Sequence, residues 1–177
     1  MLSIILILAT FILSVTSSPL EKRYTGVRIQ SYRDGKCLSP ASTNFANDVQ
    51  VISVNCSQAL RWNINPGSGS IILQQNTNFV LDAGTGTDNN EIVKLWQSYP
   101  TLFQQTWYLT TDQRIAITGG NQCLDEGPNR PQTYQCYTGN TNQIWNILQG
   151  NNLGTTPIPL PTPSAQPTGC DDELSRR

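Results

Sequence analysis

The stretch CLDEGPNRPQTYQCYTGNTNQIWNI, residues 123–147, decides the fold, because two other parts of the chain repeat its beginning and its end. It opens on Cys-Leu-Asp and closes on Gln-x-Trp followed by alternating apolar residues. The opening leucines of the three copies, at positions 38, 81 and 124, lie 43 residues apart. A fixed period of this length indicates a repeat architecture. The openings are Leu38-Ser39, Leu81-Asp82 and Leu124-Asp125, and the closing segments are Trp62-Asn63-Ile64, Trp107-Tyr108-Leu109 and Trp145-Asn146-Ile147.

Each copy is predicted to consist of short β strands joined by turns. No stretch of ten or more residues carries a convincing apolar period of 3.6, which argues against a helical repeat. Three copies are too few for a propeller, which needs at least four blades. We therefore expect an all-β domain with three internal repeats, closed on itself so that its strand edges are hidden. The expected strands cover residues 27–30, 49–54, 70–73, 92–96 and 114–117.

The N-terminal end carries the marks of secretion. Residues 2–15 are almost entirely apolar, a run too short for a membrane span of roughly 20 residues, and small residues follow it. This pattern predicts a signal peptide over residues 1–17, with a retained anchor as the alternative. Lys22-Arg23 predicts a short propeptide over residues 18–23, unless the pair is merely two solvated charges. The folded domain of this secreted, extracellular protein is then expected over residues 24–150.

The C-terminal end differs in composition from the repeats. Residues 155–168 hold five prolines among Thr, Ser and Gln, without periodicity. Such a composition cannot bury a core, so residues 151–177 are predicted to form a disordered Pro/Thr-rich tail.

Charge and composition exclude several classes of function. The chain has 11 Lys and Arg against 12 Asp and Glu, a formal net charge of −1, and no basic stripe. We therefore expect no nucleic-acid partner and no membrane insertion. It has no histidine, which removes His-based triads and His-containing metal sites, and no cofactor is expected. Asp125 and Glu126 would point to opposite sides of a strand, unlike the facing carboxylates of a glycosidase. The expectation is a binding protein, not an enzyme.

Five cysteines suggest a disulfide framework in an exported chain. Cys37 and Cys56 are close in sequence, as are Cys123 and Cys136. Each pair would close a loop of roughly 15 to 20 residues, worth about 3 kcal/mol in the chain-entropy model. Cys170 is left over, which leaves a free thiol or a dimer through Cys170 as alternatives.

Together the three repeats, the Leu-Asp pairs and the closing Gln-x-Trp resemble the ricin B-type lectins. The triplet is intact in Gln105-Thr106-Trp107 and Gln143-Ile144-Trp145, and reads Leu60-Arg61-Trp62 in the first repeat. The resemblance runs from Tyr24 to about Gly150 and implies a β-trefoil.

Family resemblance also implies a way of binding sugar. In that family an Asp accepts hydrogen bonds from two ring hydroxyls, and an aromatic side chain stacks on the apolar face of the sugar. Amides near Gln-x-Trp add donors, and the Gln of the triplet also holds the Asp in place. The implied partners are glycans or glycoproteins with galactose or N-acetylgalactosamine, while other hexoses stay open.

The third repeat matches this pattern most fully. Asp125 is its expected carboxylate, Tyr134 its aromatic platform, and Gln132, Asn142 and Gln143 its amides. The carboxylate and the aromatic residue are nine positions apart, against 14 in the second repeat. A trimmed loop is therefore expected over this site, and its preferred sugar stays open.

In the second repeat Asp82, Lys94, Trp96, Gln104 and Gln105 fall in the same register. Trp96 is out of phase with the other three tryptophans. We expect it to face solvent as a stacking residue, with a buried strand residue as the alternative. For the two aspartates the alternative is a turn cap at a strand end.

The first repeat keeps its cysteines but lacks the binding chemistry. Ser39, Val54 and Leu60 replace the carboxylate, the aromatic residue and the glutamine. We therefore expect no sugar site there. The competing function is a secreted β-trefoil protease inhibitor, which would act through one exposed loop and need none of these residues.

Overall fold

The computed structural model describes residues 24–65 and 67–150. The predicted signal peptide (1–17), propeptide (18–23) and tail (151–177), together with Cys170, lie outside the described residues. Within these two ranges, no helix is long and apolar enough to cross a membrane. The elements are β1 (Tyr24–Ser31), β2 (Cys37–Pro40), β3 (Val51–Val54), β4 (Trp62–Ile64), β5 (Ile72–Leu73), β6 (Phe79–Asp82), β7 (Lys94–Gln97), η1 (Phe103–Gln105), β8 (Trp107–Leu109), β9 (Ile115–Ile117), β10 (Gln122–Glu126), β11 (Pro131–Gln135), η2 (Thr141–Gln143) and β12 (Trp145–Leu148), where η marks a 3-10 helix.

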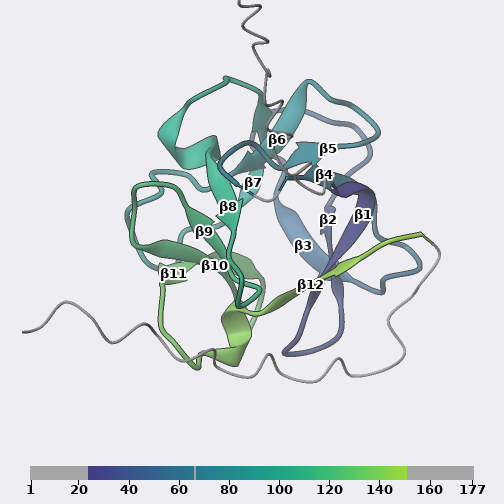
Figure 1. The fold of residues 1–177 in the computed structure, drawn as a ribbon. Coiled ribbons are helices and arrows are strands. Elements are labelled where there is room, and N and C mark those ends of the chain that lie inside the picture. The colour runs from purple at the N-terminus through teal and green to yellow at the C-terminus, as the bar shows by residue number, and fades with distance from the viewer. Residues whose placement is uncertain (1–23, 66, 151–177) are drawn as a thin grey trace, which may run out of the picture.

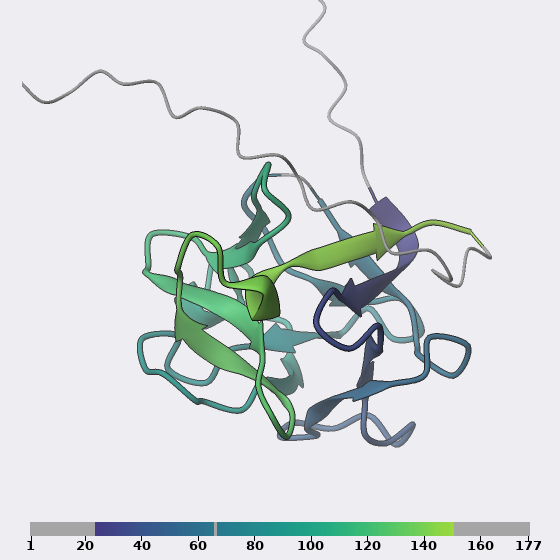
Figure 2. The same cartoon turned by 90° about the horizontal axis from the view of Figure 1, so that it is seen from below.

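The strands divide evenly among the three repeats, as β1–β4, β5–β8 and β9–β12. Neighbouring repeats join through the antiparallel pairs β4–β5 and β8–β9. The first and last strands, β1 and β12, also pair, from Arg28↔Leu148 to Ser31↔Trp145. Figure 1 shows the three groups of strands around a common centre, and Figure 2 shows β12 running beside β1. The predicted all-β trefoil is confirmed.

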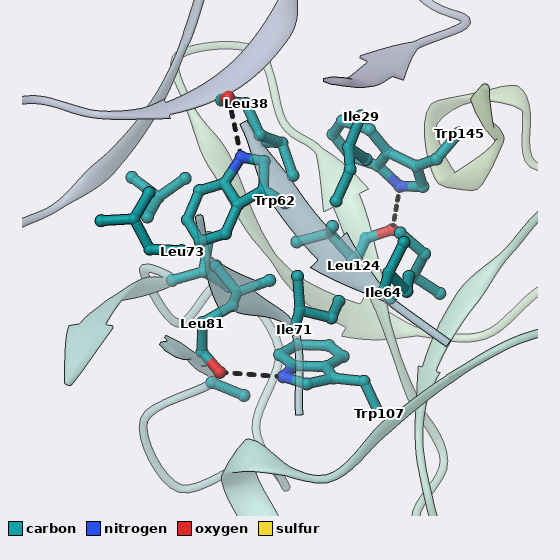
Figure 3. Close-up of a cluster of buried hydrophobic side chains, with 14 of the residues drawn as sticks. Ile29, Leu38, Trp62, Ile64, Ile71, Leu73, Leu81, Trp107, Leu124 and Trp145 are labelled. Atoms are coloured by element: carbon teal, nitrogen blue, oxygen red, sulfur yellow. Dashed lines mark hydrogen bonds between the residues drawn. The ribbon is translucent and has the colours of Figure 1, made fainter. Parts of the chain in front are cut away.

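Three tryptophans, one from each repeat, form the centre of the core. Trp62, Trp107 and Trp145 are almost completely buried. A buried indole N–H needs an acceptor, and each finds the carbonyl of the leucine that opens its own repeat (Figure 3). The Nε1–O distances are 3.1 Å to Leu38, 3.0 Å to Leu81 and 2.9 Å to Leu124. The repeated sequence motif is therefore a structural clamp that ties the last strand of each repeat to its second strand.

In each repeat the clamp leucine lies on the first strand of a hairpin: β2–β3, β6–β7 and β10–β11. Both predicted disulfides are present, Cys37–Cys56 and Cys123–Cys136, at sequence separations of 19 and 13. In the second repeat the corresponding positions are Val80, which is fully buried, and Ser98. The second repeat therefore has no disulfide at this position.

Candidate functional site

The second-repeat site is built around the carboxylate of Asp82, at the end of β6. Its side chain is only 3% exposed. Gln105 Nε2 donates to Oδ2 at 2.9 Å, and the backbone N–H of Gly84 donates to Oδ1 at 2.8 Å. Gln105 thus has the holding role expected of it. Each carboxylate oxygen takes one bond from the protein and keeps a lone pair for a further donor.

Burial raises the pKa of Asp82 above its ordinary value, because the charged form is desolvated. The hydrogen bonds from Gln105 and Gly84 and the charge of Lys94 oppose this rise, while the charge of Glu91 adds to it. Lys94 is the cross-strand partner of Asp82 in the β6–β7 hairpin. The site is therefore a buried carboxylate with a cation beside it.

Trp96 supplies an aromatic surface on the same strand as Lys94. Residues two apart on a strand share a face, and Lys94 Nζ lies 5.0 Å from the centroid of the Trp96 ring. Unlike the three core tryptophans, Trp96 is only partly buried. A partly exposed ring at this point is available for stacking.

Gln104, the remaining residue expected in this site, lies on η1 against the loop that follows Asp82. Its backbone carbonyl accepts from the N–H of Ala83 at 3.0 Å, and its side chain is partly exposed. Gly86 in that loop has φ 73°, and a Cβ there would lie 3.4 Å from Gln104 and 3.2 Å from Phe103. The glycine lets the loop and η1 approach each other closely.

The third-repeat site repeats this arrangement around Asp125, which is 4% exposed. Gln132 is its cross-strand partner in β10–β11. Burial raises the pKa of Asp125, and hydrogen bonds from Gln143, Asn140 and Gln132 oppose the rise, as does the charge of Arg33. The cross-strand partner of this carboxylate is therefore a neutral amide, where that of Asp82 is a lysine, although the charge of Arg33 also acts on Asp125.

Asn140 was not expected in this site. Its Nδ2 donates to Asp125 Oδ2 at 3.2 Å, and its Oδ1 accepts from the N–H of Asn142 at 3.1 Å as the N-cap of η2. An Asn three positions before the Gln of Gln-x-Trp is a typical N-cap signal, and this signal could have identified it. Leu102 occupies the equivalent N-cap position before η1.

The other expected residues of the third site lie around the same hairpin. Tyr134 is partly exposed and pairs with Cys123 on β10, and Asn142 is partly exposed on η2. Gln143 is fully buried, donates to the carbonyl of Gln135 at 2.9 Å and accepts from the N–H of Tyr137 at 3.0 Å. Gln105 makes the same two backbone contacts, to Gln97 and Tyr99, at 3.1 and 2.9 Å.

In the first repeat these positions hold no carboxylate and no amide. Ser39 Oγ accepts from the N–H of Leu60 at 3.3 Å. Its cross-strand partner is Ile52, where the other repeats have Lys94 and Gln132. Val54 pairs with Cys37, as Trp96 pairs with Val80.

Glu126 is a second buried acid on β10, and its side chain serves a different contact from that of Asp125. It is 4% exposed and accepts from Ser53 Oγ of the first repeat at 2.5 Å. Burial raises its pKa to about 7, against the hydrogen bond from Ser53. Asp125 instead contacts Asn140 in its own repeat. The two acids therefore do not face each other across a common site, and among the described residues no acidic or cysteine cluster could hold a metal ion.

Comparisons with known proteins agree with this fold. Residues 25–150 match the family model of the ricin-type beta-trefoil lectin domain. The C-half of an earthworm R-type lectin, solved with GalNAc, is 19% identical with a TM-score of 0.56, over 70% of this chain and 98% of that one. The C-terminal domain mutant of the earthworm lectin, solved with 6'-sialyllactose, is 18% identical with a TM-score of 0.57, over the same shares.

A designed three-fold symmetric protein, ThreeFoil, is 19% identical with a TM-score of 0.56, over 70% of this chain and 97% of that one. No curated protein sequence shows significant similarity to the chain. These structural likenesses show the β-trefoil fold, and the family match spans most of the chain, including both candidate sites. The protein belongs to the ricin-type β-trefoil lectin family.

Proposed function

We propose that the protein is a secreted, non-enzymatic lectin that binds hexoses of the galactose or N-acetylgalactosamine type through its second and third repeats. One observation carries the proposal. Asp82 and Asp125 occupy equivalent buried positions, each held by a side-chain amide and each beside a partly exposed aromatic residue. The family match and the GalNAc bound to the earthworm lectin support the class of ligand.

Such a site suits the two kinds of surface that a pyranose presents. Adjacent hydroxyls can donate together to one carboxylate, in charge-assisted hydrogen bonds. The C–H face of the ring can pack on Trp96 or Tyr134. Hydrogen bonds from side-chain amides already fix each carboxylate. Sugar binding therefore costs little conformational entropy at these side chains.

Open sites of this kind bind single sugars weakly, with a Kd near millimolar or about −4 kcal/mol. Two sites on one rigid body raise the avidity for a surface that carries many copies of the sugar. The proposed target is therefore a dense glycan surface or a glycoprotein. A dimer through Cys170 would multiply the sites again.

A glycan array with wild type, Asp82→Asn, Asp125→Asn and the double variant tests this function. Asn keeps the shape of the side chain but removes the charged acceptor. Each single variant should lose part of the signal, and the double variant nearly all of it. Ser39→Ala, at the equivalent position of the first repeat, is the matched control and should bind like wild type. Full-strength binding of the best glycan by the double variant would disprove the assignment.

Secretion is proposed on the apolar run at residues 2–15 and on the two disulfides, which form in oxidising compartments. Expression of the full chain in a secreting host, followed by N-terminal sequencing of the protein in the medium, tests it. The expected N-terminus is Tyr24, after cleavage at Lys22-Arg23. A start near residue 18 would refute the propeptide, and retention of the full chain in membranes would refute secretion.

A further inference from the structure

Each candidate site is touched by a loop from the preceding repeat. The loop before β3 pairs with β7 of the second repeat, where the N–H of Asp48 donates to the carbonyl of Leu95 at 3.0 Å. The loop before β7 pairs with β11 of the third repeat, where the N–H of Asn90 donates to the carbonyl of Thr133 at 2.7 Å. In each candidate site, a loop segment of the preceding repeat is thus hydrogen-bonded alongside one strand.

The two loops dock in the same way in detail. Asp48 and Asn90 both have left-handed backbones, with φ of 70° and 65°. The residue before each is an asparagine, and its Oδ1 accepts a backbone N–H of the next repeat at 2.7 Å in both cases. Asp and Asn tolerate this backbone region better than other non-glycine residues. The docking is therefore a repeated feature of the fold.

The side chains of these loop residues reach the residues beside the site carboxylates. Asp48 Oδ1 accepts from Lys94 Nζ at 2.8 Å, and Asn90 Oδ1 accepts from Gln132 Nε2 at 3.3 Å. The chemical types match within each pair: an acid faces the lysine, and an amide faces the amide. Lys94 and Gln132 are in turn the cross-strand partners of Asp82 and Asp125.

The first repeat lacks this contact as well as the carboxylate. The loop that would serve it is the short segment 127–130, between β10 and β11. Ile52 stands where Lys94 and Gln132 stand in the other hairpins. Loss of the long loop therefore coincides with loss of the polar side chain that such a loop would hold.

We propose that Asp48 and Asn90 are positioning residues for the sites of the second and third repeats, so that each site is completed by the repeat before it. This inference rests on the proposed function. Lys94 donates to the carboxylate of Asp48 and is the cross-strand partner of Asp82. Without Asp48 its ammonium turns towards Asp82 and competes with the hydroxyls of the sugar. Asn90 orients Gln132 in the same position, without a charge.

Glycine is the appropriate replacement, because it removes each side chain and fits the positive φ. Each site is isolated by inactivating the other, and N-acetylgalactosamine is titrated by NMR. In an Asp125→Asn background, Asp48→Gly should weaken binding about two- to fivefold, the range of an exposed ion pair. In an Asp82→Asn background, Asn90→Gly should weaken it by a similar factor. Each variant should leave the site that it does not contact unchanged.

Salt separates a positioning role from a structural one. At about 1 M salt the Debye length is near 3 Å, so the loss caused by Asp48→Gly should shrink. The loss caused by Asn90→Gly, which removes a neutral contact, should stay the same. Asp48→Asn keeps an oxygen for Lys94 and should restore most of the affinity while removing its salt dependence.

The proposal is wrong if either glycine variant leaves its own site unchanged, or if it weakens both sites equally. The Asp48–Lys94 contact can also be measured without sugar. The indole NMR signal of Trp96, which lies beside Lys94, should shift with salt in wild type and not in Asp48→Gly. If this shift is seen while the Asp82→Asn/Asp125→Asn double variant still binds glycans fully, the proposed function fails and the Asp48–Lys94 contact stands. If the Trp96 signal of Asp48→Gly has the same position and the same salt dependence as that of wild type, Asp48 does not position Lys94.

Discussion

The first and third repeats have the same scaffold and differ in the chemistry that the scaffold carries. Both have a disulfide across the hairpin and a buried tryptophan bound to the leucine carbonyl at the start of the repeat. Only the third has a carboxylate with amides around it. The clamp of the third repeat uses Leu124 and Trp145, and the site uses the neighbouring Asp125 with the amides around it, so different side chains serve the two roles. A repeat can lose its site without losing its place in the core.

The largest expected effect is on stability, because the core tryptophans of the two repeats have the same role. Trp62→Ala, in the repeat without a site, and Trp145→Ala, in the repeat with one, should each lower the free energy of unfolding by about 3–5 kcal/mol. Each removes a large buried side chain and leaves the carbonyl of Leu38 or Leu124 without its donor. Urea unfolding followed by circular dichroism measures this loss.

Trp96→Ala is the matched control, because its ring is only partly buried. It should cost clearly less stability while weakening binding at the second repeat. If Trp62→Ala lowered the free energy of unfolding only slightly, the first repeat would not share the core role of the third, and the comparison between the repeats would fail.

The next largest effect is the pH dependence of stability that arises from a contact between the first and third repeats. Glu126 of the third repeat accepts from Ser53 of the first, and its pKa lies at about 7 against an ordinary 4.5. Because the folded state holds this proton more tightly, the contribution of Glu126 to stability is complete below about pH 4.5 and is lost as the pH rises through 7. A shift of this size corresponds to at most about 3 kcal/mol. Urea unfolding between pH 4 and 8 measures it.

Glu126→Gln keeps the shape of the side chain and has no proton to lose. It should unfold at higher urea than wild type at pH 7.5, and much of the decline between pH 4.5 and 7 should disappear. The raised pKa values of Asp82 and Asp125 act in the same direction and leave a smaller slope. An unchanged pH profile in this variant would show that Glu126 is ionised at no cost.

Much of the fold followed from the sequence because the opening leucines recur every 43 residues and a tryptophan closes each copy. The tryptophans and leucines of each clamp, the paired cysteines and the partly exposed Trp96 could all be read within one repeat. The approach of Asp48 to Lys94 and of Asn90 to Gln132 could not, because it joins a loop of one repeat to a strand of the next. Such contacts depend on how the repeats rotate about the centre, which the spacing alone does not show.

The smallest expected effect tests the residue that sequence analysis missed. Asn140→Leu places in the third repeat the residue that the second has at Leu102. It removes the hydrogen bond to Asp125 and the side-chain cap of η2, while Gln143 and Gln132 remain. N-acetylgalactosamine affinity in an Asp82→Asn background should fall about two- to fivefold, the value of one hydrogen bond. The pKa of Asp125 should rise further, because a hydrogen bond that lowers it is gone, and carboxyl NMR can follow this titration.

Asn140→Asp keeps the cap and places a second acid beside Asp125, so it should raise the pKa of Asp125 more than Asn140→Leu does. Equal pKa values in wild type and both variants would mean that Asn140 caps the helix and has no part in the site.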